Sequence, residues 1–222
     1  MNTAKQSAWF VTGTDTEVGK TFSTCALLYA LQARGIAAIG MKPVAAGTDS
    51  EGKNDDVESL VAASSVKASR ELVNPYLFSP PIAPHIAAHE AGRHIDIGHI
   101  VASFNALRPL ADCVLVEGVG GFCVPLEETS DTADMARALG LPVILIVGMR
   151  LGCINHALLT QQAIRQAGLP LAGWIANRID PSMSRFEENL EALKTRMQAP
   201  LLGIIPANST PQRAAASLSL PG

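Results

Sequence analysis

Short aliphatic runs alternate with longer amphipathic segments along most of this sequence, and no other feature constrains the fold as strongly. The runs are almost continuously apolar, as is typical of parallel strands that are buried on both faces. We expect strands at residues 9–12, 37–44, 113–117, 142–148, 171–177 and 201–205. Strands that alternate with helices predict an α/β fold with a mostly parallel sheet flanked by helices.

The segments between these strands carry helical patterns. We expect helices at residues 20–33, 56–64, 97–107, 131–139, 154–166 and 183–197. Gly35, Gly140 and Gly168 follow three of these segments and precede the next apolar run, where a helix commonly ends in a left-handed residue. The spacing of elements therefore supports repeated strand and helix units.

The length of 222 residues fits one domain, and we expect residues 1–222 to form a single unit. Residues 1–7 and 213–222 lack a core-forming pattern, so we expect both ends to fray. Residues between 44 and 113 interrupt the alternation with polar and proline-containing sequence. An insertion of this length usually serves function, and we expect it to help build a site over the strand ends.

Composition excludes several classes of protein. With 17 basic and 20 acidic residues the net charge is −3, and no basic block marks a nucleic-acid or anionic-membrane surface. No apolar run approaches the roughly 20 residues that cross a bilayer, and no signal peptide is evident, so a cytoplasmic location is expected. The four cysteines lack disulfide or zinc spacing. Charged residues make up only 17%, which leaves apolar surface for a partner subunit to cover.

The strongest local motif runs from Gly13 to Thr21, between an expected strand and an expected helix. Its glycines allow backbone N–H groups to approach a phosphate chain, Lys20 suits the β and γ oxygens, and the Thr21 hydroxyl suits Mg²⁺. Five residues separate Gly13 from Gly19, one more than in the usual P-loop. The strand-loop-helix context nevertheless predicts a P-loop NTPase-like fold; a glycine turn with a solvated lysine is the alternative.

Three further residues are candidates for the same site. Glu117 ends an apolar run and precedes a glycine-rich loop, at the sheet edge where α/β proteins bind ligands, although a surface acid is an alternative. Lys42 is a charge in an apolar segment, and a functional and a solvated lysine are equally compatible with its position. Asp56 either supplies a metal carboxylate or caps a helix, and capping is the better interpretation of its position alone.

Two other positions follow strands. Residues 151–156 open a helix whose N–H groups could hold a carboxylate, or form an ordinary turn. Asn177 could read a base edge or begin a turn. His85, His89, His94 and His99 do not keep one helix face, so no histidine metal site is assigned, and no nucleophile motif predicts covalent catalysis.

In order along the chain, GTDTEVGKT, MKPVAAG, NDD, VEGVGG, LGCINHALLT, GWIAN and PLLGIIP resemble the motifs of dethiobiotin synthetases. The resemblance extends from Phe10 to Pro206. It implies a homodimeric ligase of biotin biosynthesis that closes a ureido ring on 7,8-diaminononanoate with CO₂ and MgATP. A carbamate and a carbamic-phosphoric anhydride are the implied intermediates, and dethiobiotin, ADP and phosphate are the implied products.

The resemblance also implies roles for individual residues. The implied catalytic residues are Lys42, Lys20 and Thr16, and the implied Mg²⁺ ligands are Thr21, Asp56 and Glu117. The implied ATP-binding residues are Glu17, Val18, Gly19, Lys20, Thr21, Phe22, Asp56, Glu117, Gly118, Val119, Gly120, Asn177, Arg178 and Pro206. The implied substrate-binding residues are Thr16, Lys42, Ala46, Gly152, Cys153, Ile154 and Asn155, the last four reaching across the dimer.

The sequence departs from the family where many members have serine and this chain has Ala46. The alternative function is a P-loop ATPase that acts as a conformational switch on protein partners. Such switches carry an additional lysine early in the phosphate loop, and no lysine lies between Gly13 and Lys20. A small-molecule kinase usually needs an arginine-rich lid, but the insertion has only scattered arginines. The sequence therefore favours the synthetase.

Overall fold

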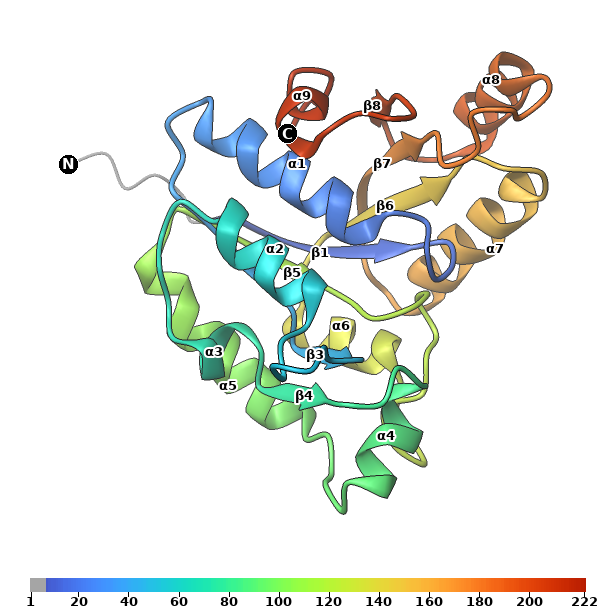
Figure 1. The fold of residues 1–222 in the computed structure, drawn as a ribbon. Helices are drawn as coiled ribbons and strands as arrows, with labels where there is room; N and C mark the ends of the chain where they lie inside the picture. The colour runs from blue at the N-terminus through green and yellow to red at the C-terminus, as the bar shows by residue number, and fades with distance from the viewer. Residues whose placement is uncertain (1–6) are drawn as a thin grey trace.

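The computed structural model describes residues 7–222 and contains a six-stranded parallel sheet with strand order β2-β5-β1-β6-β7-β8 (Figure 1). Its strands are β1 (Ser7–Gly13), β2 (Ala38–Met41), β5 (Cys113–Glu117), β6 (Val143–Gly148), β7 (Leu171–Asn177) and β8 (Leu201–Ile205). The predicted fold class is confirmed. Residues 1–6 of the end expected to fray lie outside the described residues, and Ser7 begins β1.

Helices cover both faces of the sheet. One face packs against α1 (Lys20–Gln32), α2 (Asp55–Ala63) and α9 (Pro211–Ala215). The other packs against α5 (Ile97–Leu107), α6 (Thr132–Leu139), α7 (Cys153–Gln166) and α8 (Phe186–Arg196). The central strands are buried along nearly their whole length, which explains their continuous apolar sequence. None of the helices in the described chain has the length and apolar character needed to cross a bilayer.

Several local predictions are confirmed. The strands predicted at 113–117, 171–177 and 201–205 and the helix predicted at 97–107 have the observed bounds. Gly35, Gly140 and Gly168 adopt φ values of +72°, +65° and +74°. Glycine adopts this left-handed conformation without the steric cost that a Cβ would add, so these positions end their helices as the sequence pattern predicted.

The single strand predicted at 37–44 is wrong, because β2 ends at Met41 and a separate strand follows. Strand β3 (Val44–Ala46) pairs in parallel with β4 (Tyr76–Phe78) in a two-stranded sheet. Pro43 between them has no N–H to donate to a sheet ladder. The chain leaves the central sheet here, and the N–H of Lys42 donates to the carbonyl of Val73 instead.

The insertion contains elements that the sequence did not predict. These are β4, α3 (Arg70–Val73), α4 (Pro84–Glu90) and a 3₁₀ turn at Arg108–Leu110. All four are short, so their sequences span too few turns or alternations to show a clear period. Figure 1 shows β3, β4 and α4 together below the central sheet.

The prediction that residues 213–222 fray is wrong. Helix α9 packs on α1, with Ala214 and Leu218 in the core beneath it. Leu218 forms an antiparallel bridge with Gly203 of β8, and its carbonyl accepts a hydrogen bond from Arg34 at 3.2 Å. The tail is held by contacts with α1 and β8, which are distant from it in sequence. No periodic pattern within the short tail itself therefore predicts its packing.

Candidate active site

The predicted polar residues gather at the carboxyl ends of the parallel strands. The predicted phosphate loop, residues 13–21, begins at the end of β1, Lys42 follows β2, Glu117 ends β5 and Asn177 ends β7. Parallel strands present their carboxyl ends at one edge of the sheet, which is where open α/β folds bind ligands. The strand order places β1 between β5 and β6, so the phosphate loop is central among these groups.

The conformation of the phosphate loop depends on its glycines. A Cβ on Gly13 would lie 2.6 Å from a methyl group of Val18. Gly19 has φ +78°, and a Cβ there would lie 2.2 Å from the amide nitrogen of Asn177. That amide donates a hydrogen bond of 2.9 Å to the carbonyl of Val18. Asn177 therefore holds the loop against β7, a role that its position at the end of a strand did not reveal.

Helices α1 and α7 begin differently from α2, α5 and α6, which have capping side chains. Among the described residues, no side chain caps α1 or α7, and the first turn of each has no acidic residue. Their N-caps are Gly19 and Gly152, both left-handed. A helix start of this kind has N–H groups and a positive dipole end available for an anion.

A buried cluster of charges lies beside the phosphate loop. Lys42 Nζ lies 2.6 Å from Oε1 of Glu117 and 3.0 Å from Oδ2 of Asp56. The hydroxyl of Thr21 also donates to Oε1 of Glu117, at 2.6 Å. Lys42 and Glu117 are almost completely buried, whereas Asp56 is half-exposed. Four segments distant in sequence thus contribute to one polar cluster.

The two lysines differ in their electrostatics. Burial lowers the pKa of Lys20 to about 8, and the positive charge of Lys42 acts in the same direction. Burial also opposes the charged form of Lys42, but the carboxylates of Glu117 and Asp56 outweigh it and raise the pKa of Lys42. Burial acts to raise the pKa of the Asp56 carboxyl, yet the charge of Lys42 and its hydrogen bond hold that pKa below the usual value. Lys42 is therefore a permanent cation at neutral pH.

The cluster has the donors that Mg²⁺ prefers. Oε2 of Glu117 is buried and has no hydrogen-bond partner among the described residues, so this carboxylate has an unused acceptor beside the Thr21 hydroxyl. The described chain contains no group of three or more His, Cys, Asp or Glu side chains suited to a metal. Mg²⁺ commonly binds through one or two carboxylates together with substrate phosphates and water, so two carboxylates and a hydroxyl fit this ion.

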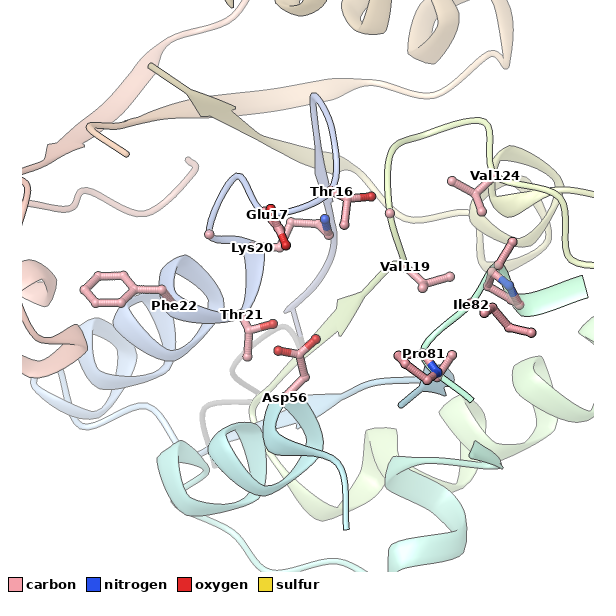
Figure 2. Close-up of a pocket in the computed structure, with 15 residues that line it drawn as sticks. Thr16, Glu17, Lys20, Thr21, Phe22, Asp56, Pro81, Ile82, Val119 and Val124 are labelled. Carbon is pink, nitrogen blue, oxygen red and sulfur yellow. The ribbon is translucent and has the colours of Figure 1, made fainter. Parts of the chain in front are cut away.

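A cavity of about 770 Å³ opens over the phosphate loop. Figure 2 shows Thr16, Lys20, Thr21 and Asp56 on its polar side, and Pro81, Ile82, Val119 and Val124 on its apolar side. The complete lining is Thr16, Glu17, Gly19, Lys20, Thr21, Phe22, Ala46, Asp56, Pro81, Ile82, Ala83, Pro84, Val119, Gly120 and Val124. A ligand with a charged end and an aliphatic part matches this division.

A second cavity of about 260 Å³ lies on the other side of the phosphate loop, between the ends of β7 and β8. It shares Glu17, Gly19 and Phe22 with the first cavity. Its remaining lining residues are Asn177, Arg178, Ile179, Pro181, Ile205, Pro206, Ala207, Asn208 and Ser209. The shared residues connect the two cavities, as a nucleotide that spans a phosphate site and a base site would require.

Comparisons with known proteins identify the family. The family model described as "AAA domain" matches residues 7–214. An ATP-dependent dethiobiotin synthetase from Aromatoleum aromaticum is 60% identical over 97% of this chain and 98% of its own length. Another from Nitrosospira multiformis is 58% identical over 89% of this chain and 87% of its own length. The chain belongs to the dethiobiotin synthetase family.

Solved structures support the fold of this dethiobiotin synthetase family member. The cell division ATPase MinD of Pyrococcus furiosus has a TM-score of 0.57 at 17% identity, over 91% of this chain and 84% of that one. A ParA family ATPase of Chlorobium tepidum has a TM-score of 0.57 at 13% identity, over 93% and 86%. At these identities the likeness concerns the fold alone.

Most of the site residues expected of a dethiobiotin synthetase line the two cavities. The others do not line either cavity, and their positions are as follows. Lys42 and Glu117 lie beneath the first cavity and contact Asp56, which lines it. Val18 is buried and offers its carbonyl to Asn177, and Gly118 packs closely against the ring of Phe10. Residues 152–155 line neither of the two cavities within the described chain.

The sequence did not single out several lining residues. The apolar wall of the first cavity includes Pro81, Ile82, Ala83, Pro84 and Val124. The prolines and the length of the insertion did predict that it helps to build a site, but not which residues face the ligand. The second cavity adds Asn208 and Ser209, which follow the last recognised motif and had no local signal.

Proposed function

We propose that this chain catalyses the ATP-dependent closure of a ureido ring on 7,8-diaminononanoate with CO₂, forming dethiobiotin, ADP and phosphate in the cytoplasm. The observation that carries the proposal is the first cavity. It combines a phosphate loop and a buried lysine-carboxylate cluster with an apolar wall, in a chain that is 60% identical to a dethiobiotin synthetase. An alkyl diamine that must meet ATP requires both sides of such a cavity.

The reaction divides into three bond-forming steps. One amine of the diamine adds to CO₂ and loses a proton, giving a carbamate. A carbamate oxygen then attacks the γ-phosphorus, and the bond to the bridging oxygen of ADP breaks. The second amine attacks the carbonyl carbon of the resulting anhydride and loses a proton, while the bond from that carbon to the phosphate oxygen breaks, which releases phosphate and closes the ring. Each step needs alignment and charge stabilisation more than a protein nucleophile.

The cations of the site suit the second step. Lys20 projects from the phosphate loop, where its Nζ lies 3.1 Å from the carbonyl of Asp15, and in the proposal it binds the β and γ phosphates. Lys42 stays charged and stabilises the carbamate and the transferring phosphoryl group. Thr16 lines the cavity and donates its hydroxyl to the same oxygens. Fixed cations at a site of developing negative charge lower the barrier without reorganisation.

Thr21, Asp56 and Glu117 are proposed to hold Mg²⁺. When bound, the ion neutralises charge on the β and γ phosphate oxygens. The unpartnered Oε2 of Glu117 supports this assignment, because a buried carboxylate oxygen without a donor is costly unless a cation or donor meets it. Glu117 and Thr21 are already in contact, so the chain itself holds these two groups in place.

The second cavity is proposed to take the adenine base. Asn177, Arg178 and Pro206 line it, as expected for an adenine site, together with the backbone of the turn after β8. The Arg178 guanidinium stacks over the ring of Phe186 at 4.7 Å, and one of its nitrogens donates to the carbonyl of Pro181. The arginine is thereby held at the rim, and polar groups on the lining suit the edge of a base.

We also propose a homodimer in which residues 152–155 meet the substrate carboxylate of the partner's site. Leu151, directly before this turn, is 93% exposed, and Leu159 on α7 is 58% exposed. A partner subunit that covered these two leucines would remove their apolar surface from water. The uncapped start of α7 supplies N–H groups for a carboxylate.

Product analysis tests the proposed function. Purified protein with MgATP, bicarbonate and 7,8-diaminononanoate should form dethiobiotin, ADP and phosphate in equal amounts, measured by mass spectrometry and a phosphate assay. Omission of the diamine is the control and should abolish ADP formation. ATP turnover that is the same with and without the diamine would contradict the synthetase and favour the conformational-switch alternative.

A further inference from the structure

Asp15, near the tip of the phosphate loop, makes three contacts. Its Oδ1 accepts a hydrogen bond from the backbone N–H of Thr16 at 2.8 Å. Its Oδ2 lies 2.6 Å from a guanidinium nitrogen of Arg150, and its backbone carbonyl accepts from Lys20 Nζ at 3.1 Å. One residue thus contacts the proposed catalytic threonine, the phosphate-binding lysine and an arginine that none of the motifs had suggested for the site.

Arg150 belongs to the segment between β6 and α7, and the end of β6 just before this segment supports the loop at a second point. The N–H of Thr14 donates to the carbonyl of Ile146, and the N–H of Gly148 donates to the Thr14 hydroxyl at 3.4 Å. The loop also contains Glu17 at φ +58°, a left-handed conformation that costs energy for a residue with a side chain. A strained loop of this kind needs contacts from outside itself to keep its shape.

Arg150 also directly precedes the exposed turn that begins at Leu151 and leads into α7. Its backbone carbonyl accepts the N–H of Cys153 at 3.0 Å, so the turn is closed on Arg150 itself. The backbone of this arginine is therefore part of the proposed carboxylate-binding turn, while its side chain holds the phosphate loop.

We propose that Arg150 is a positioning residue that acts through Asp15 to hold the phosphate loop, and that it links the nucleotide site to the carboxylate-binding turn before α7. The second part rests on the proposed function, and the first does not. Because coupling between two sites is reciprocal, a nucleotide that fixes the loop then strengthens diamine binding, and the diamine strengthens nucleotide binding by the same factor. In the proposed homodimer the turn serves the partner's site, so the link joins the two active sites.

A double-mutant cycle tests the first part. The affinity of a non-hydrolysable ATP analogue with Mg²⁺ is measured by calorimetry for the full chain and for Arg150→Gln, Asp15→Asn and the double variant. Both side chains are almost half-exposed, so each single change should weaken binding about two- to fivefold, as for a partly exposed ion pair. The double variant should bind the analogue at least as tightly as the single variant with the lower affinity, because the two residues act as one unit.

Two further variants make the result specific. Arg150→Lys keeps the charge and should recover most of the affinity. Arg165→Gln removes an arginine on α7 that pairs with Gln198 at the surface, and should leave the affinity unchanged. Additive losses in the cycle, or an Arg150→Lys variant as weak as Arg150→Gln, would overturn the positioning role.

The link to the turn has its own measurement. The affinity for 7,8-diaminononanoate is measured with and without the ATP analogue. The affinity with the analogue, divided by the affinity without it, should exceed one in the unaltered chain and fall towards one in Arg150→Gln. An unchanged ratio in Arg150→Gln would overturn the link. Failure of the unaltered chain to bind the diamine at all would instead contradict the proposed function and remove the link with it, while the nucleotide cycle would still decide the positioning role.

Discussion

Lys42 and Glu117 form a buried ion pair in which Nζ of the lysine lies 2.6 Å from Oε1 of the glutamate. The same oxygen accepts the hydroxyl of Thr21, and Asp56 completes the surroundings of the ammonium group. The pair joins the end of β5 to the residue after β2. It couples the proposed metal ligands to the proposed catalytic cation, so a change in one partner must affect the other.

Lys42→Met should reduce turnover by about 100-fold or more, because a fixed cation is removed from the transferring phosphoryl group. Binding of an ATP analogue should change by only a few-fold, since Lys20 and the loop remain. Steady-state kinetics and calorimetry measure the two effects. Lys53→Met, which removes an exposed lysine paired with Glu51, is the control. Equal losses of binding and turnover would show that Lys42 is structural.

Lys42→Met should also leave the buried carboxylate of Glu117 without its cation, and this should lower the stability of the protein. Removing one partner of a buried ion pair typically costs about 3–5 kcal/mol, because the other charge stays buried without compensation. Mg²⁺ should therefore raise the unfolding temperature of Lys42→Met more than that of the unaltered chain. Thermal unfolding with and without the ion measures this difference. An identical response would argue against Glu117 and Asp56 as ligands.

Lys20→Met should stabilise the protein at pH 7 while abolishing nucleotide binding. The pKa of Lys20 falls from 10.5 to about 8 in the folded chain, so below pH 8 folding must bury a charge that the unfolded chain exposes to water. The unfolded state binds more protons between pH 8 and 10.5, and stability therefore rises with pH across this window. A shift of this size corresponds to about 1–3 kcal/mol once screening is allowed for.

Denaturant unfolding at pH 7 and near pH 10 checks the sign of this effect. Lys20→Met should be more stable than the unaltered chain at pH 7, and the advantage should shrink at the higher pH because the native lysine then loses its proton. Lys194→Met, at a lysine on α8 that pairs with Glu191 at the surface, is measured at both pH values as the control. A Lys20→Met variant that is less stable at pH 7 would refute the prediction.

Asn177→Ala should weaken the ATP analogue about tenfold. The side-chain amide of Asn177 holds the carbonyl of Val18, and its removal leaves that buried acceptor without a partner at a cost of about 1–3 kcal/mol. Calorimetry reports the affinity and thermal unfolding the stability. Asn189→Ala, at a partly exposed α8 residue whose amide donates to the carbonyl of Arg185, is the matched control. Unchanged nucleotide affinity would show that the loop keeps its shape without this contact.

Ile82→Asp should raise the KM for the diamine about tenfold and leave the KM for ATP almost unchanged. The substitution places a carboxylate in the apolar wall, where the alkyl chain is proposed to lie, and removes contact worth about 1–2 kcal/mol. Ile86→Asp changes an isoleucine of similar exposure that does not line the cavity and should have little effect. A parallel rise in both KM values would place the effect on the whole site instead.

The residues of the proposed phosphate site could be named from the sequence because each belongs to a local pattern. Glycines beside Lys20 and Thr21, and an acid at the end of an apolar run, are recognisable within a few residues, and the parallel sheet then brings strand ends together. For Lys42 and Asp56 local pattern alone left the role open. Only the fold shows that Lys42 contacts Asp56 and Glu117 at once.

The sequence by itself determined the parallel α/β architecture, the phosphate loop and the chemical types of the site residues, since periodicity and glycine placement are local properties of a chain. The tertiary structure decided the break of the predicted strand at Pro43, the packing of the tail on α1, the wall formed by Pro81 and Ile82, and the support of the loop by Arg150. Each of these depends on contacts between distant segments, which form only when burial of the whole core fixes the segments relative to one another.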